Sequence, residues 1–229
     1  MTSKSVISFQ TADVMPAHLM SGTALGNENV SASDMAIPVL ALAQAMSPEV
    51  GKKSDPKYIK GLEMGHVFNK LTGEFWDTVF VINLKFETGF TIFKKREEGG
   101  GFEGNHESLA AANKHLADNG LNEAVHDIVE TAKHTVACID DEGKASVAVI
   151  YMSGANKKVS DAWNTALAQS GTDRFGTVWA LESVEEKNRM GQGYQVFKAT
   201  NKGYPTPELY AEARATYFAM KGMTDPTIH

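Results

Sequence analysis

Residues 78–95 read TVFVINLKFETGFTIFKK, and this stretch decides the fold. Apolar and polar side chains alternate from residue 78 to residue 86, which predicts a half-buried strand. One face of that strand is expected to hold Phe80, Ile82, Leu84 and Phe86. The sequence Glu-Thr-Gly at 87–89 predicts a turn, after which residues 90–95 return as a partner strand. The centre of the fold is therefore predicted to be an antiparallel hairpin.

Other apolar runs predict further short strands on both sides of this hairpin. These runs cover residues 37–46, 66–70, 134–139, 144–152, 176–184 and 193–199. The sequence Asp141-Glu142-Gly143 predicts the turn that joins two of them. Because the strands come in neighbouring pairs along the chain, antiparallel pairing is favoured over parallel pairing.

Four segments are predicted to be helical. They cover residues 105–119, residues 121–133, the region of residues 159–167 and the segment that begins at residue 206. Thr206 followed by Pro207 is a typical helix start, with the threonine as cap. Gly99–Gly101 predicts a flexible connector, because three glycines in a row suit neither a helix nor a strand interior.

These elements predict an α+β fold, a mostly antiparallel OB-like β-barrel with inserted helices and a C-terminal helix. Residues 1–35 are rich in Ser, Thr, Ala, Gly and Asn and hold few large apolar side chains. We expect them to form a mobile N-terminal arm. Residues 36–229 would then form a single domain.

The composition excludes several classes of protein. With 229 residues, 42% hydrophobic and 22% charged, the chain is typical of a globular protein. Its one cysteine, Cys138, excludes an intrachain disulfide and a zinc site made of several cysteines. The apolar stretch 37–46 is too short to span a bilayer, and the N-terminus lacks the apolar run of a signal peptide. We expect a cytoplasmic protein with no membrane partner.

Charge is segregated along the chain. The net charge is −6, yet residues 51–96 carry nine positive and five negative charges, a net of +4. Residues 97–142 carry two positive and eleven negative charges, a net of −9. This pattern favours a surface with separate basic and acidic faces, although clustered solvated charges would look the same in the sequence.

The basic segments also contain aromatic residues, and this combination is typical of proteins that bind single-stranded nucleic acid. Cations neutralise phosphates, and aromatic rings stack on bases. The candidate DNA-binding residues are Lys52, Lys53, Lys57, Tyr58, Trp76, Phe93, Lys94, Lys95, Arg96, Tyr151, Lys157, Lys158, Phe197 and Lys198. Any single ring in this set could equally belong to the hydrophobic core.

Other chemistries have weaker support in the sequence. On a helix, His126, Glu130 and His134 would share one face, but the motif spacing of a metal site is absent. Cys138 lies in an apolar strand and is expected to be inert. The acids Glu97, Glu98, Glu103 and Glu107 are dense enough to suggest a Mg²⁺-dependent nuclease, and equally an exposed acidic loop.

Four motifs resemble a known family. They are IPVLALAQAMSPEV at 37–50, KKSDPKYIKG at 52–61, EMGHVFNKLTGEFWD at 63–77 and KKREEGGGFEGNH at 94–106. These stretches are similar to tailed-phage single-stranded-DNA-binding proteins of the replication module. The resemblance implies an OB-like barrel that coats DNA in phage replication or recombination. It also implies a homo-oligomer in the host cytoplasm that contacts phage replication proteins.

The sequence thus predicts a sequence-tolerant single-stranded-DNA-binding protein. We expect no enzymatic activity, no cofactor and no metal. The first alternative is a virion or assembly protein that binds other proteins, since such proteins share the acidic, strand-rich composition. The second alternative is the Mg²⁺-dependent nuclease.

Overall fold

The structure is a computed structural model that describes residues 36–224, and its compact unit begins at Ile37. The predicted arm, residues 1–35, lies outside the described residues. The strands are β1 (Val39–Leu42), β2 (Val67–Asn69), β3 (Phe75–Trp76), β4 (Thr78–Lys94), β5 (Gly101–His106), β6 (His126–Ile139), β7 (Ala145–Met152), β8 (Val178–Lys187) and β9 (Gly193–Gly203). The helices are α1 (Leu109–Asp118), α2 (Ala155–Gln169), α3 (Pro207–Met220) and a 3-10 turn, η3 (Arg96–Glu98).

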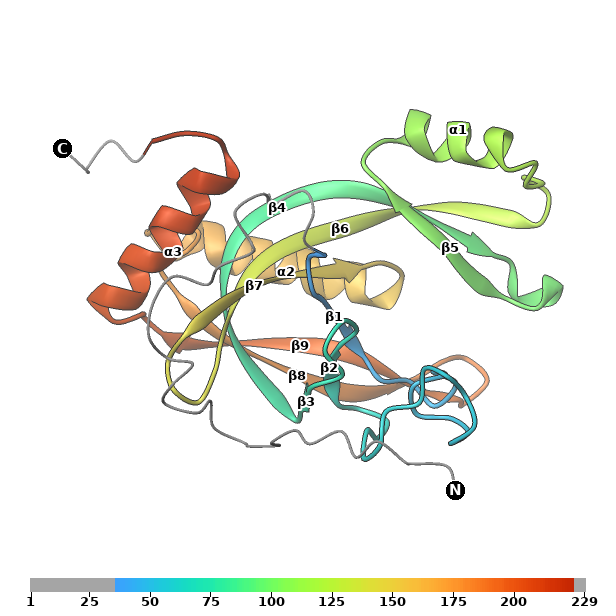
Figure 1. The fold of residues 1–229 in the computed structure, drawn as a ribbon, viewed down its shortest axis with the longest axis horizontal. Helices are drawn as coiled ribbons and strands as arrows, with labels where there is room; N and C mark the ends of the chain where they lie inside the picture. The colour runs from blue at the N-terminus through green and yellow to red at the C-terminus, as the bar shows by residue number, and fades with distance from the viewer. Residues whose placement is uncertain (1–35, 225–229) are drawn as a thin grey trace, which may run out of the picture. The chain divides into compact units, whose positions relative to one another are not determined.

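All nine strands of residues 36–224 belong to one sheet, whose order is β3-β2-β1-β7-β6-β4-β8-β9, with β5 paired to β4. Every pairing is antiparallel except that of β1 with β7, which is parallel. Figure 1 shows β4 and β6 as long curved ribbons that run from the region of α3 to the region of α1. The predicted α+β class with mostly antiparallel strands is confirmed.

The sheet curls into a half-barrel whose seam is bridged by side chains. The amide of Gln44 donates to the carbonyl of Gln195 at 2.8 Å and accepts from its backbone N–H at 2.9 Å. Asn156, in the first turn of α2, accepts from the backbone N–H of Phe197 at 2.7 Å. Side-chain amides therefore satisfy backbone groups of β9 that no neighbouring strand reaches.

The turn predicted at residues 87–89 is wrong, because β4 is one strand of 17 residues. It pairs with β6 from Phe80 opposite Ile139 to Lys94 opposite His126. Gly89 is buried, and a Cβ at this position would lie 3.1 Å from the carbonyl oxygen of His106. The glycine permits close packing of neighbouring strands and does not make a turn.

The prediction that Phe86 lies on the same face of the strand as Ile82 and Leu84 is also wrong. The register with β6 shifts between Asn83 and Lys85, which makes Leu84 the extra residue of a β-bulge. Ile82 and Leu84 pack in the cluster that includes α3, whereas Phe86 packs against the cluster that includes α2. A bulge reverses the alternation of faces that a regular strand would keep.

The helix predicted over residues 121–133 is wrong as well. Residues 126–139 form β6, the strand between β4 and β7, so pairing on both edges overrides local helical pattern. The helix predicted from residue 105 begins at Leu109, because Asn105 and His106 pair with β4. Ser108 caps this helix and accepts from the backbone N–H of Ala111 at 3.1 Å.

Other predicted elements are confirmed. The hairpin of β6 and β7, the helix α2 and the pair β8–β9 all form where the sequence indicates. Thr206 caps α3 with Pro207 in its first turn. Helices α2 and α3 pack in two different hydrophobic clusters, and α1 packs in a third with the distal part of β4. Among residues 36–224, no helix is long and apolar enough to cross a membrane.

Candidate nucleic-acid interface

A groove of about 510 Å³ lies between β4, the segment before β8, and α3; we call it the α3 groove. Strand β4 contributes the residues of the bulge, and α3 contributes one long side of the groove. The lining residues are Leu84, Lys85, Phe86, Asp173, Arg174, Phe175, Arg214, Tyr217, Phe218 and Lys221. Four of these side chains are cations, four are aromatic rings and one is a carboxylate.

The sequence of α3 and its C-cap residue, Lys221, explains how one helix supplies four of these groups. Arg214, Phe218 and Lys221 follow at spacings of four and three residues, so they share one helix face. Ala213 is buried and Tyr217 packs beside it in the hydrophobic cluster that holds α3 on the sheet. The apolar stripe anchors the helix, and the neighbouring stripe lines the groove together with Tyr217, which belongs to both surfaces.

Arg174 is held by hydrogen bonds to the protein core. Its Nε donates to Oδ1 of Asn83 at 2.7 Å, and its Nη2 donates to Oδ1 of Asn164. Asn83 is fully buried, since none of its surface is exposed. The guanidinium also lies over the ring of Phe86, 5.5 Å from the ring centroid. Folding therefore fixes the position of this cation before any ligand arrives.

A buried histidine completes this network. Oδ1 of Asn83 accepts from Arg174. The other end of the Asn83 amide, its nitrogen, therefore faces Nδ1 of His134 at 2.9 Å. Nδ1 must then accept, so Nε2 carries the proton and donates to Oγ of Ser160 at 2.8 Å. Burial, with the nearby charges of Arg174 and Lys157, lowers the pKa of His134 to about 3. The imidazole is thus neutral near neutral pH, and the network keeps one set of donors and acceptors.

Cations and rings are paired along the groove. Arg214 lies over Phe218 and Lys221 over Tyr217, each 5.3 Å from the ring centroid. With Arg174 over Phe86, three of the four cation–π pairs among residues 36–224 line this one groove. Such pairs place a positive charge next to an aromatic ring. In a single-stranded nucleic acid, the charge can contact a phosphate while the ring stacks on the neighbouring base.

Two carboxylates moderate the positive charge of the groove. Asp173 accepts from the hydroxyl of Tyr210 at 2.7 Å, and this hydrogen bond raises the pKa of the tyrosine. Lys85 pairs with Glu87 at 2.7 Å. Since the lining holds four cations and one carboxylate, the groove is still positive overall.

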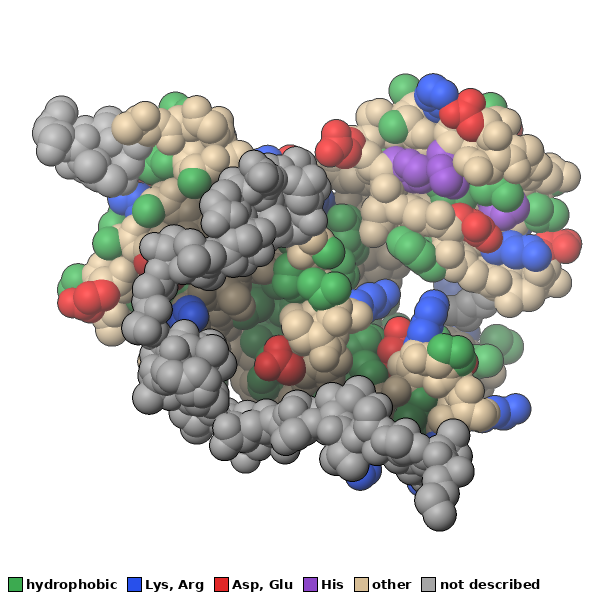
Figure 2. Space-filling model, viewed as in Figure 1, with side chains coloured by type: hydrophobic (Ala, Val, Ile, Leu, Met, Phe, Trp, Pro, Cys, Tyr) green, Lys and Arg blue, Asp and Glu red, His purple; other side chains and the backbone are tan. Residues whose placement is uncertain are grey.

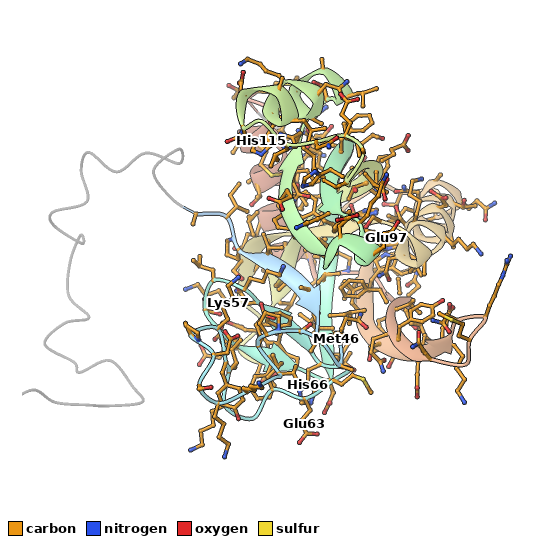
Figure 3. All side chains as sticks on the ribbon, turned by 90° about the vertical axis from the view of Figure 1, so that its right-hand side faces the viewer. Met46, Lys57, Glu63, His66, Glu97 and His115 are labelled. Atoms are coloured by element: carbon orange, nitrogen blue, oxygen red, sulfur yellow. The ribbon has the colours of Figure 1, made fainter. Side chains whose placement is uncertain are left out.

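The lysines predicted from the sequence lie elsewhere. Lys52, Lys53 and Lys57 are exposed in the segment between β1 and β2, and Lys158 is exposed on α2. Figure 3 shows Lys57 in that segment, at a distance from Glu97 near the end of β4. None of these lysines lines the α3 groove.

The remaining predicted cations are mostly in ion pairs. Lys95 donates to the carbonyl of Ala124 at 2.7 Å and lies 3.8 Å from Asp127. Lys157 pairs with Asp161 at 2.7 Å, and Lys198 pairs with Glu182 at 2.8 Å.

Two predicted cations remain at the end of β4. Lys94 is half-buried there. The side chain of Arg96 lies outside what the structure describes. The predicted basic residues therefore occupy at least four separate elements.

The predicted aromatic residues divide in a similar way. Phe197 is 3% exposed and belongs to the core, so a base cannot stack on it, and this prediction is wrong. Trp76 is half-buried and packs against the same core. Tyr58 and Phe93 are half-buried, and Phe93 meets the exposed ring of Phe102 edge-on. Tyr151 lines a second pocket, described below.

The four glutamates of the nuclease alternative do not gather in one site. Glu97 and Glu98 lie on η3, Glu103 lies 3.8 Å from His126, and Glu107 lines the second pocket. Within the described part of the chain, no three His, Cys, Asp or Glu side chains are grouped to hold a metal ion.

The histidines and the cysteine also depart from the metal-site and nucleophile interpretations. His126 and His134 lie on a strand instead of a helix, and His134 stacks on Trp163 in the core. Figure 2 shows histidines gathered beside α1, where the rings of His106 and His115 are 4.7 Å apart. Burial raises the pKa of the Cys138 thiol to about 12.

Fold and groove together define an α+β protein whose curled antiparallel sheet carries a basic groove lined with aromatic rings. The chain belongs to the family of Pam3 phage gp34-like proteins, whose family model matches residues 9–225. It is therefore a phage protein, and the family description names no activity. No curated protein and no solved structure matches the chain.

Proposed function

We propose that the protein binds single-stranded DNA, without strong sequence preference, in the α3 groove. The observation that carries this proposal is the set of three cation–π pairs along one groove. Arg174, Arg214 and Lys221 neutralise phosphates, while the rings of Phe86, Tyr217 and Phe218 provide surfaces for bases. The curled sheet serves as an OB-like platform for the strand.

A single strand fits this arrangement better than a duplex. Stacking on a side-chain ring requires an exposed base face, and a duplex hides both faces of each base. The groove offers paired charge and ring surface at three points, so phosphate contacts and stacking occur together. Cytosine, thymine, adenine and guanine all have a π-face, which explains sequence tolerance.

The phage family supports a biological setting for this proposal. A protein that coats single strands protects them during phage replication or recombination in the cytoplasm of the infected cell. Coating brings many copies next to each other on one strand, so we expect a homo-oligomer that also meets phage replication proteins. An assembly protein of the virion would show no salt-dependent affinity for DNA.

The test is the affinity for a single-stranded oligonucleotide as a function of salt. Replacing two groove cations, Arg214→Gln with Lys221→Gln, should weaken binding about tenfold at moderate salt. It should also reduce the magnitude of the log–log salt slope by about 1.4, because each lost phosphate contact contributes about 0.7. The matched control, Lys114→Gln with Lys187→Gln, removes two exposed charges outside the groove.

Two results with single strands, and one with a duplex, would contradict the proposal. One is an absence of single-strand binding by the wild-type protein, which would favour the assembly protein. The other is an equal effect of the two double variants, both still folded by circular dichroism. Tighter binding to a duplex of the same length would also exclude a single-strand site.

A further inference from the structure

A second pocket, of about 410 Å³, adjoins the α3 groove along β4; we call it the β5 pocket. Its wall toward the groove is a chain of three charged side chains. Glu87 contacts Lys85 at 2.7 Å and Lys133 at 3.3 Å. Lys85 lines the α3 groove, whereas Glu87 and Lys133 line the β5 pocket. A DNA strand that leaves the α3 groove past Lys85 would therefore reach the β5 pocket.

The lining of the pocket comes from four strands and the segment after β5. Glu87 on β4 is opposite Lys133 on β6, and Lys133 is opposite Tyr151 on β7. These three side chains thus form a row across the sheet. The edge strand β5 adds Asn105, and Glu107 follows directly after it.

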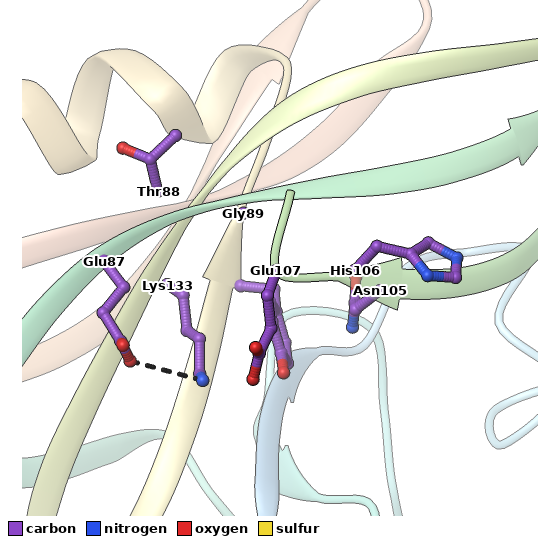
Figure 4. Close-up of a pocket in the computed structure, with 8 residues that line it drawn as sticks. Glu87, Thr88, Gly89, Asn105, His106, Glu107 and Lys133 are labelled. Carbon is purple, nitrogen blue, oxygen red and sulfur yellow. Dashed lines mark ion pairs between the residues drawn. The ribbon is translucent and has the colours of Figure 1, made fainter. Parts of the chain in front are cut away.

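Polar groups in this pocket converge. Figure 4 shows the side chains of Glu87, Lys133, Asn105 and Glu107 pointing to the same side of the strands. The ring of His106 is turned away from them (Figure 4). The Asn105 side chain is fixed, because its Oδ1 lies 2.6 Å from the hydroxyl of Thr91.

The charges in the pocket disfavour a phosphate as its occupant. The lining holds two carboxylates, Glu87 and Glu107, and one ammonium, that of Lys133. Glu87 is paired with both Lys85 and Lys133, so Glu107 is the carboxylate left to face a ligand. A phosphate would meet like charge at Glu107, so the electrostatic attraction that holds it in the α3 groove is absent here. The pocket instead presents a carboxylate acceptor next to the donors of Lys133 and Asn105. Adjacent donors and acceptors match the edge of a nucleobase.

We infer that the β5 pocket binds one base of the strand held in the α3 groove and prefers a base with an exocyclic amine. This inference rests on the proposed function. Tyr151 stacks on the base, and the carboxylate of Glu107 accepts from the amine. Lys133 donates to a ring nitrogen or carbonyl oxygen on the same edge.

The preference follows from the chemistry of the base edges. An exocyclic amine offers N–H donors to a carboxylate. In uracil and thymine the same position is a carbonyl oxygen, and their one N–H lies between two carbonyl oxygens. These oxygens repel a carboxylate that approaches the N–H. One such contact modulates affinity while the groove remains tolerant of sequence.

The test compares oligonucleotides of deoxycytidine and of deoxyuridine with the same length. The two bases have the same size and differ at the amine position. The wild-type protein should bind the cytosine strand about fivefold or more tightly, because a matched base contact contributes about 1–3 kcal/mol. In Glu107→Gln the two affinities should agree within about twofold, since the amide can also donate to a carbonyl. The control, Glu98→Gln, removes an exposed carboxylate on η3 and should keep the preference.

A further variant separates stacking from hydrogen bonding. Tyr151→Leu should weaken binding of both strands by a similar factor, because each base has a face that stacks. Equal affinity of the wild-type protein for the two strands would overturn the inference, as would a preference that survives in Glu107→Gln. Failure to bind either strand would instead contradict the proposed function, so the two failures are distinct.

Discussion

The basic loop of residues 51–60 and the α3 groove both combine cations with aromatic rings, but they hold them differently. The loop exposes Lys52, Lys53 and Lys57 to solvent. In the groove, Arg174 is bound to two asparagines and Lys221 lies over a ring. The loop has more cations per residue of sequence, whereas the cations of the groove are held in place by hydrogen bonds and ring contacts.

This difference has an energetic consequence for binding. Immobilising a long exposed side chain costs about 0.5–1.5 kcal/mol in conformational entropy, which reduces the affinity of a contact made by a loop lysine. For Arg174 this cost is met during folding, because the network of Asn83, Asn164 and His134 already orders it. We therefore expect the positions of the cations, more than their number, to determine the affinity for DNA.

The largest effect is expected from a change at Asn83, which joins Arg174 of the groove to the buried His134. Asn83→Ala removes the hydrogen bond that Nε of Arg174 donates and the one that Nδ1 of His134 accepts, while Nη2 of Arg174 keeps its bond to Asn164. The free energy of unfolding should fall by about 2–3 kcal/mol, measured by urea denaturation. Asn113→Ala, on the exposed face of α1, should change it by less than about 0.5 kcal/mol. Similar losses in the two variants would show that the network contributes little.

The same network predicts how stability depends on pH. The folded-state pKa of His134, about 3, is lower than its ordinary value of 6.5. Below about pH 6.5 the unfolded chain binds a proton that the folded chain does not, so stability falls as the pH falls. The expected loss is about 2 kcal/mol between pH 6.5 and about pH 5. In His134→Gln this part of the slope should disappear; an unchanged slope would place the titrating groups elsewhere.

Much of the fold could be predicted from the sequence, because turn and capping residues lie where the strands and helices of the structure begin and end. The turn at Gly143 and the cap at Thr206 fix two connections through short-range chemistry. The continuous course of β4 could not be predicted, because Gly89 is typical of a turn and its real role is a close approach to His106. The strand β6 was missed because its pairing on both edges is set by residues distant in the sequence.

The α3 groove could be predicted only in part. The spacing of Arg214, Phe218 and Lys221 along a helix is visible in the sequence and indicates a second face on α3. Arg174 carries no such signal, because its partners lie 10 and 91 residues away. The bulge at Leu84, which brings Lys85 and Phe86 to the groove, is equally invisible in a regular alternation of side chains.

A smaller effect is expected from removing one ring of the groove. Phe218→Leu keeps an apolar side chain but removes the π-face beside Arg214. The affinity for single-stranded DNA should fall about fivefold to tenfold, at the low end of the usual stacking contribution per base. Phe80→Leu is the matched control, because Phe80 is 45% exposed on β4 and does not line the groove. An equal loss in both variants would mean that stacking in the groove is not part of binding.

The smallest effect is expected in the basic loop itself. Replacing Lys52, Lys53 and Lys57 by glutamine removes three charges, one more than the double variant of the groove. The affinity at moderate salt should nevertheless change by less than about twofold, because exposed charges more than about 8–10 Å from the DNA are screened. The salt slope should also stay the same, since no phosphate contact is lost. A large loss of affinity in this triple variant, with the slope reduced by about two, would place the loop on the DNA. The path of the strand would then have to extend from the α3 groove to the segment between β1 and β2, and the order imposed on Arg174 would not be what selects the binding surface.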